Sequence, residues 1–160
     1  MTIPTSIQEF LKKSGRPYTT LEHPVAYTSQ EEAAAAHVSG KEWAKAVVCF
    51  ADDEPILAVL PAHYTVQTDR LRALVGARKL RLAEERELAP LYPECEPGAM
   101  PPLGPLFGQP VFVDQSLTKD PEIVFDAGTH TDAIRMRYAD FAEIVEPTVG
   151  AFGRPPGHED

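Results

Sequence analysis

The stretch AKAVVCFADDEPILAVLPA, residues 44–62, decides the fold. Two apolar, β-rich runs, residues 44–51 and 56–62, flank the turn-forming residues DDEP, which is typical of antiparallel strands that are neighbours in a sheet. Both runs are almost continuously hydrophobic, as strands at the centre of a sheet are. We therefore expect a β-hairpin in the middle of the domain.

Amphipathic helices are expected on both sides of this hairpin. Two of them begin at a serine with a glutamate three residues later, Ser6 with Glu9 and Ser29 with Glu32, which is the spacing of a capping box. The first three end at a glycine, and Thr68 is the expected N-cap of the third. The predicted helices are residues 5–15, 29–40, 68–76, 83–93 and 138–146.

The remaining strands and the domain limits complete the predicted fold. The strands expected outside the hairpin are residues 18–24, 79–83, 111–114, 122–127 and 133–138. This order of elements is neither a regular βα alternation nor an all-β pattern. We predict an α+β fold: a single domain, residues 1–146, with a mixed, mostly antiparallel central sheet flanked by short helices. Residues 147–160 are expected to form a flexible C-terminal tail.

Composition is typical of one soluble domain. Of 160 residues, 43% are hydrophobic and 24% are charged, which is close to the average of globular domains. No secretory signal or membrane-spanning stretch is visible, so we expect a cytoplasmic protein with no membrane partner. The two cysteines lack CxxC spacing and fit reduced thiols, and Cys49 is expected to be buried and unreactive.

Charge and motif content exclude several function classes. A formal net charge of -9 argues against loose binding to nucleic acid, although it says little about one local site. The sequence contains no phosphate-binding loop, GxGxxG, HExxH, GxSxG or EF-hand motif. The five histidines, His158 among them, have no metal-ligand spacing. We therefore expect neither a cofactor nor a metal.

Three features could carry chemistry, and each also has a purely structural interpretation. Lys45 opens an apolar strand, so its side chain either reaches solvent or points a cation into a pocket. The segment DAGTHTDAI, residues 126–134, is either a hairpin turn or a loop that offers backbone N–H groups and an imidazole. Five cations lie on or beside two predicted strands. If these strands lie close together, the cations form a basic surface that could contact a nucleic-acid backbone; otherwise they belong to the solvent-exposed face of a sheet. They are Arg78, Lys79, Arg81, Arg135 and Arg137.

A proline-rich segment, ECEPGAMPPLGPLFGQP, occupies residues 94–110 and holds three glycines and five prolines. It lies inside the predicted domain with strands required on both sides, so it does not join two folded units. Proline fixes φ at about -65° and thereby reduces the entropy lost on ordering. We expect a stiff loop in which Gly98 permits conformations that a side chain would block.

Four segments in a fixed order resemble one known family. They are KEWAKAVVCF followed by ILAVLPA, then ARKLRLAEERE, then EPGAMPPLG with VFVDQSL, and finally FDAGTHTDAIRM. The ordered set is similar to the YbaK family of aminoacyl-tRNA deacylases, which is also the editing domain inserted in many bacterial prolyl-tRNA synthetases. The resemblance covers residues 20–146. It implies a YbaK-like α+β domain that hydrolyses the ester between a wrong amino acid and the 3′ end of a tRNA.

The resemblance also implies a set of site residues. Lys45 matches the family's lysine near the terminal adenosine and the scissile ester, although Lys41 is close in sequence. Gly98 and Pro102 match the GxxxP loop that borders the amino-acid pocket, which makes the proline-rich segment a pocket wall. Asp114 matches the aspartate after this loop, and the turn before the last predicted strand faces it. The expected catalytic residues are Lys45, Gly98 and His130, and the expected substrate-binding residues are Pro102, Asp114, Gly128 and Thr129.

The function implied is that of a freestanding deacylase that acts on mischarged tRNA, with an aminoacyl-tRNA synthetase as a further partner. An aminoacyl ester is already activated, so a positioned water and stabilisation of the developing oxyanion suffice for hydrolysis. Two other functions stay open: a non-catalytic module that binds tRNA or a synthetase, and a hydrolase of another small acyl ester. The sequence does not predict which amino acid is removed.

Overall fold

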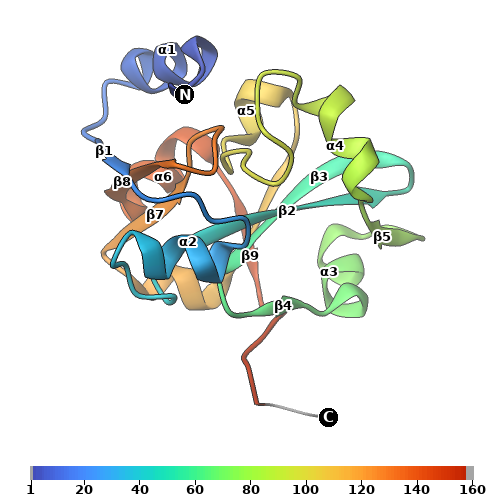
Figure 1. Cartoon of the computed structure of the whole chain (residues 1–160). Helices are drawn as coiled ribbons and strands as arrows, with labels where there is room; N and C mark the ends of the chain where they lie inside the picture. Colours follow the sequence, from blue (N-terminus) through green and yellow to red (C-terminus); the bar gives the residue numbers. More distant parts are fainter. Residues whose placement is uncertain (1, 158–160) are drawn as a thin grey trace.

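The computed structural model describes residues 2–157 (Figure 1). The helices are α1 (Thr5–Ser14), α2 (Ser29–Ala35), α3 (Thr68–Val75), α4 (Glu85–Leu91), α5 (Gly104–Phe107) and α6 (Tyr138–Val145), with the 3-10 helix η1 (Gln115–Lys119). The strands are β1 (Thr19–Glu22), β2 (Ala44–Ala51), β3 (Glu54–Pro61), β4 (Thr65–Val66), β5 (Leu80–Leu82), β6 (Val111–Asp114), β7 (Glu122–Asp126), β8 (Asp132–Arg137), β9 (Thr148–Gly150) and β10 (Gly153–Arg154).

Two β-sheets form the centre of the domain. The larger sheet has five strands in the order β5-β2-β3-β6-β9, and the smaller has three in the order β1-β8-β7. All pairs of the smaller sheet are antiparallel. In the larger sheet β2 pairs antiparallel with β3 and β5, whereas β6 pairs in parallel with β3 and β9. The predicted α+β fold with a mixed central sheet and short flanking helices is confirmed.

The predicted hairpin is the β2–β3 pair, which lies inside the larger sheet. Ala51 pairs with Glu54 next to the turn. The two turn residues, Asp52 and Asp53, both have positive φ, 48° and 70°, as a tight hairpin turn with the twist of its strands requires. Aspartate tolerates this left-handed conformation better than most residues do, so the DDEP sequence suits the turn.

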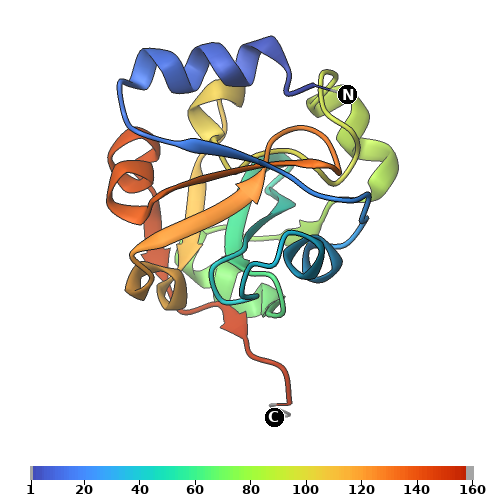
Figure 2. The same ribbon diagram turned by 60° about the vertical axis from the view of Figure 1, so that its left-hand side comes forward.

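The two faces of the larger sheet are covered differently. One face packs against the smaller sheet in the main hydrophobic core, where Val59 of β3 and Phe125 of β7 lie. The opposite face packs against α3 through Leu60 and Leu71, together with Phe152 near the C-terminus. Figure 2 shows α1 lying across the end of the molecule next to α5, far from the C-terminal segment. Alternation along each strand therefore decides which core a side chain enters.

A short junction connects the two sheets. Trp43, just before β2, forms an isolated parallel bridge with Val124 of β7, whose N–H donates to the carbonyl of Glu42 at 2.9 Å. Trp43 is completely buried. Because the pairing is parallel, β2 and β7 leave this bridge in the same direction, and Lys45 lies two residues after Trp43. This junction sets the position of the candidate site.

The helix starts differ from the predicted capping boxes. Helix α2 is capped by Thr28 rather than Ser29, and the Thr28 hydroxyl accepts from the N–H of Glu31 at 3.1 Å. The cap lies one residue earlier because Thr28 adopts the extended conformation that an N-cap needs. Helix α1 has no side-chain cap, although α1 and α3 end, as predicted, at a left-handed glycine. As a consequence Glu32 is free of a capping role, and it is buried.

The C-terminal segment differs from the expected flexible tail. Residues 148–150 form β9 in parallel with β6, and residues 153–154 form β10 beside β4. Phe152 between them is fully buried against α3. The buried ring of Phe152 provides the apolar contact that holds this segment on the domain, whereas the sequence analysis expected the segment to be flexible. His158 lies outside the described residues.

Candidate functional site

The proline-rich segment meets the turn between β7 and β8. We call residues 94–99 the Gly98 loop and residues 127–131 the His130 turn. Four hydrogen bonds join them: Glu96 N–H to Gly128 O (2.8 Å), Gly128 N–H to Ala99 O (2.8 Å), His130 N–H to Glu96 Oε1 (2.6 Å) and His130 Nε2–H to Pro97 O (2.9 Å). The structure thus brings together the predicted residues Gly98, Gly128, Thr129 and His130.

Two glycines at this junction are required for different reasons. Gly98 has a φ of +87°, and a Cβ there would lie 3.7 Å from His130 Cε1, which is an ordinary contact. Its positive φ therefore requires glycine. Gly128 has a φ of +95°, and a Cβ there would lie 2.7 Å from the Pro4 ring, so the start of the chain packs directly on it. Gly98 is exposed and its N–H donates to no described residue, which leaves it free for a ligand.

The remaining polar groups of the His130 turn bond to one another. The hydroxyl of Thr129 donates to Asp132 Oδ2 at 2.6 Å and accepts from the backbone N–H groups of Thr131 and Asp132 at 3.2 and 3.0 Å. Thr129 is buried. Its side chain therefore holds the turn together, and these contacts do not support the expected role in substrate binding.

The base of the proline-rich segment is closed by a buried pair. Tyr92 donates its hydroxyl to the side-chain carbonyl of Gln109, and its ring meets Phe107 edge-on with ring centroids 4.7 Å apart. A Cβ at Gly104 would lie 2.2 Å from the carbonyl oxygen of Gln109, so only glycine fits there. Pro102, between these contacts, is buried. The segment is a fixed loop, as its composition predicts.

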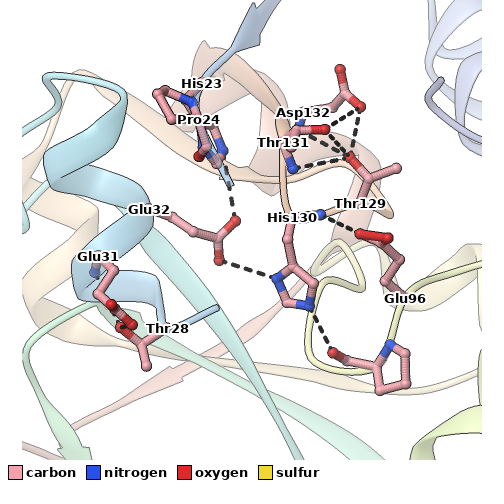
Figure 3. Close-up of polar contacts among 11 residues, drawn as sticks. His23, Pro24, Thr28, Glu31, Glu32, Glu96, Thr129, His130, Thr131 and Asp132 are labelled. Atoms are coloured by element: carbon pink, nitrogen blue, oxygen red, sulfur yellow. Dashed lines mark hydrogen bonds and ion pairs between the residues drawn. The ribbon is translucent and has the colours of Figure 1, made fainter. Parts of the chain in front are cut away.

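A cluster of buried titratable side chains lies behind the His130 turn (Figure 3). Glu32 of α2 is at its centre. Glu32 Oε2 lies 3.7 Å from His23 Nε2, and Glu32 Oε1 lies 4.0 Å from His130 Nδ1. The other ring nitrogen of His23, Nδ1, is 2.8 Å from the Pro24 carbonyl. We call His23, Glu32, Asp126 and His130 the buried cluster.

Both carboxyl groups of the buried cluster have a raised pKa. Burial is the main cause that raises the pKa of Glu32 far above its ordinary value, and the adjacent Asp126 raises it further. Burial also raises the pKa of Asp126, while its hydrogen bond with Glu32 and the nearby imidazoles oppose that rise. Each of the four residues has a buried polar atom that forms no hydrogen bond with the described residues. Within residues 2–157 no group of three or more side chains is arranged to hold a metal ion.

Lys45 lies on the same face of β2 as Trp43, which is the side of the buried cluster. Its side chain is half-buried, and it forms no hydrogen bond or ion pair with any of residues 2–157. Burial lowers the pKa of the Lys45 ammonium. A desolvated cation without a protein partner is available to a phosphate or a carbonyl oxygen. Lys41, the alternative, is exposed.

Asp114 has a different role from the one expected. Its buried carboxylate accepts from the backbone N–H of Ser116 (3.2 Å), Phe152 (3.0 Å) and Gly153 (2.7 Å), and from the Ser116 hydroxyl. These four donors cap η1 and fasten the C-terminal segment. Asp114 therefore offers little acceptor capacity to a substrate.

The five cations of the sequence analysis do not form one surface. Strand β5 lies at the edge of the larger sheet, whereas β8 lies in the smaller sheet. Arg81 pairs with Glu87, and Arg135 pairs with Glu42 and Glu122. Because the strands are separate and these charges are neutralised locally, the interpretation as a basic nucleic-acid surface is wrong. The expected unreactive thiol is present, since burial raises the pKa of Cys49 to about 12.

Sequence reasoning missed four residues of this region: His23, Glu32, Glu96 and Asp126. The Ser29–Glu32 spacing led to a capping role for Glu32, although Thr28 and Glu31 have the same spacing in the sequence. Tyr27 was also missed. It is 72% exposed, and its ring lies against His130 with centroids 5.1 Å apart.

Known proteins resemble this chain over the part that contains these residues. The family described as aminoacyl-tRNA editing domain matches residues 23–144. A proline–tRNA ligase of Staphylococcus saprophyticus is 29% identical over 140 residues, which is 86% of this chain and 23% of the ligase. The chain thus spans about a quarter of the length of that relative. Within residues 2–157 no helix has the length and apolar character needed to cross a bilayer.

Solved structures share the fold. A proposed trans-editing enzyme for prolyl tRNA synthetase superposes with a TM-score of 0.80 at 22% identity, over 94% of this chain and 98% of that one. A hypothetical protein superposes with a TM-score of 0.83 at 20% identity, over 93% and 99% of the two chains. At these identities the likeness concerns the fold, whereas the sequence match carries the family assignment. The chain belongs to the aminoacyl-tRNA editing domain family.

Proposed function

We propose that this protein hydrolyses the ester that joins a wrong amino acid to the 3′ end of a tRNA. It acts in trans in the cytoplasm, with an aminoacyl-tRNA synthetase as its partner. Family membership supports the reaction class. The observation that carries the proposal is the half-buried Lys45, without a protein partner, two residues after the bridge to β7, the strand that leads to the His130 turn.

The reaction needs few protein groups. A water oxygen attacks the ester carbonyl carbon, and the carbonyl oxygen becomes an oxyanion. The bond to the ribose oxygen then breaks, that oxygen takes the proton that the attacking water gives up, and the free amino acid and the tRNA leave. Lys45 and the unengaged N–H of Gly98 are the donors that stabilise the oxyanion or the adjoining phosphate. Pro102 forms part of the amino-acid pocket wall.

His130 has a supporting role in this proposal. Its Nε2–H donates to Pro97, and its Nδ1 is buried beside Glu32 without a hydrogen bond, so neither nitrogen faces a water molecule outside the buried cluster. The imidazole instead holds the residue before Gly98 in place. Gly128 and Thr129 hold the turn, and Asp114 holds the C-terminal segment.

Tyr27 is the proposed contact for the terminal base. Its ring is exposed, and it lies against His130 at the outer side of the buried cluster. Aromatic side chains bind unpaired bases by stacking, which tolerates any base. In this proposal the terminal base lies beside the loop that carries Gly98.

A panel of mischarged tRNAs tests the function. We expect the wild type to deacylate at least one of them, and Lys45→Ala to lower kcat/KM by about 100-fold, the effect of losing one oxyanion donor. Lys41→Ala is the matched control and should retain activity. Urea unfolding of both variants checks that the fold is intact. Failure of the wild type on every tRNA, or full activity of Lys45→Ala, rejects the proposal.

A non-catalytic tRNA-binding module is the second candidate. The hydrogen bond of His130 Nε2 and the burial of its Nδ1 favour it, since that residue then supplies no general base to a water outside the buried cluster. Binding of an uncharged tRNA without cleavage of any mischarged one supports this alternative. Absence of binding rejects it.

A further inference from the structure

Backbone carbonyls fix the two imidazoles of the buried cluster. A carbonyl oxygen only accepts, so His23 donates from Nδ1 to Pro24, and His130 donates from Nε2 to Pro97. In the neutral imidazole the other nitrogen is a lone pair. Both remaining nitrogens, His23 Nε2 and His130 Nδ1, point toward Glu32 (Figure 3).

Glu32 therefore faces acceptors on every side. His23 approaches from the segment after β1, His130 from the turn, Asp126 from the end of β7, and Glu96 from the Gly98 loop. Glu32 Oε2 forms no hydrogen bond with the described residues, and the one side-chain hydrogen bond of this carboxyl group is with Asp126, another acid. The distances to the imidazoles, 3.7 and 4.0 Å, exceed those of a formed hydrogen bond.

An ionised Glu32 does not suit this environment. The residue is only 1% exposed. Burying a carboxylate without a hydrogen-bond donor costs on the order of several kcal/mol. A neutral carboxyl group avoids that cost and can itself donate a hydrogen bond. The raised pKa of Glu32 has the same origin, burial first and Asp126 second. Asp126, which also interacts with both imidazoles, is the group best placed to remain ionised and accept the Glu32 proton.

We propose that Glu32 is held as a neutral carboxylic acid at neutral pH and that, through His130, it is a positioning residue for Gly98. Three steps lead from Glu32 to Gly98: Glu32 Oε1 lies 4.0 Å from the buried His130 Nδ1, which is proximity without a hydrogen bond, His130 Nε2–H donates to the Pro97 carbonyl, and Gly98 follows Pro97. The link to catalysis rests on the proposed deacylase function. The protonation state of Glu32 does not.

The protonation state is tested by NMR of protein labelled with 13C at glutamate carboxyl carbons. The Glu32 signal is identified by its loss in Glu32→Gln, and Glu31→Gln identifies the exposed neighbour as the control. We expect the Glu32 carboxyl carbon to show the chemical shift of a protonated acid at pH 7. A Glu32 signal with the chemical shift of a carboxylate at pH 7 overturns the proposal, whether or not the protein hydrolyses any ester.

Activity on a cleaved mischarged tRNA tests the positioning. We expect Glu32→Ala to lower kcat by about tenfold or more with little change in KM, since small displacements of a reacting group are costly. Glu32→Gln, which is neutral and can donate, should recover most of that loss. 15N spectra should show His130 protonated at Nε2 in wild type and Glu32→Gln. Equal loss of kcat in both variants, or no loss in Glu32→Ala, overturns the positioning role. If Glu32→Ala does not fold, the kcat of Glu32→Gln against wild type decides.

Discussion

Asp114 and Glu32 are both buried carboxyl groups, with 3% and 1% of their surface exposed, yet their surroundings are opposite. Asp114 receives four hydrogen bonds, three of them from the backbone. Glu32 has no backbone donor among the described residues: its Oε2 forms no hydrogen bond, and its side-chain hydrogen bond is with another acid, Asp126. Burial alone therefore does not define the role of an acidic side chain. The number of donors around it separates a structural anion from an acid that keeps its proton.

The strongest test of this comparison is Asp114→Ala. The substitution leaves the N–H groups of Ser116, Phe152 and Gly153 without their acceptor, so we expect a loss of unfolding free energy of about 3 kcal/mol or more. Urea denaturation at pH 7 measures the loss. Asp69→Ala is the control, because 96% of that side chain is exposed, and it should change stability by less than about 0.5 kcal/mol. A small effect at Asp114 would mean that the C-terminal segment is held by Phe152 packing alone.

The pH dependence of the unfolding free energy tests the other member of the comparison, the protonated Glu32. The folded-state pKa of Glu32 is raised, so above its unfolded pKa the folded state binds one proton more than the unfolded state. The unfolding free energy should then fall by about 1.4 kcal/mol per pH unit as pH rises toward the folded pKa. Glu32→Gln removes this contribution. Its stability relative to wild type should increase by about 3 kcal/mol from pH 6 to pH 8.

Urea denaturation at pH 6, 7 and 8 measures this difference. The pKa of Asp126, raised to about 6, contributes with the same sign but mainly below this range. Glu31→Gln, an exposed change on the same helix, should follow wild type at each pH. If wild type and Glu32→Gln show the same slope, Glu32 is ionised in the folded protein and the contrast with Asp114 is lost.

The smallest expected effect concerns Tyr27, the exposed ring that lies against His130 at the outer side of the buried cluster. Tyr27→Ala should weaken binding of a mischarged acceptor stem by about tenfold, since stacking of one base is worth about 1–3 kcal/mol. Tyr27→Phe should bind like wild type. Leu82→Ala, an exposed apolar change on β5, controls for loss of surface area. Fluorescence anisotropy with a labelled stem measures the affinities, and an unchanged value for Tyr27→Ala removes the base-stacking role.

The sequence predicts the fold better than the site. The β-hairpin, the glycines that end α1 and α3, and the fixed proline-rich loop follow from local chemistry and are present, whereas α2 ends at Ala35, before the expected Gly40. The capping boxes failed because Thr28–Glu31 and Ser29–Glu32 have equal spacing, and only the tertiary structure decides which glutamate turns inward. The basic surface required strands β5 and β8 to lie close together, and the sequence does not indicate that they join different sheets.

The resemblance located the loop and the turn, but it did not reveal how their residues are engaged. Gly98 and His130 do lie together, whereas the contacts of Asp114 and Thr129 are internal. Such differences arise from hydrogen bonds between residues far apart in the chain, as between Glu96 and the backbone of His130. No local pattern encodes these pairings.

The single tryptophan of the chain has an optical consequence. Trp43 stands edge-on to the imidazole of His23, with ring centroids 5.9 Å apart and an interplanar angle of 78°. Its indole is fully shielded from solvent, so this chromophore is surrounded by the protein interior rather than by water. The domain therefore contains an intrinsic fluorescent probe beside the buried cluster.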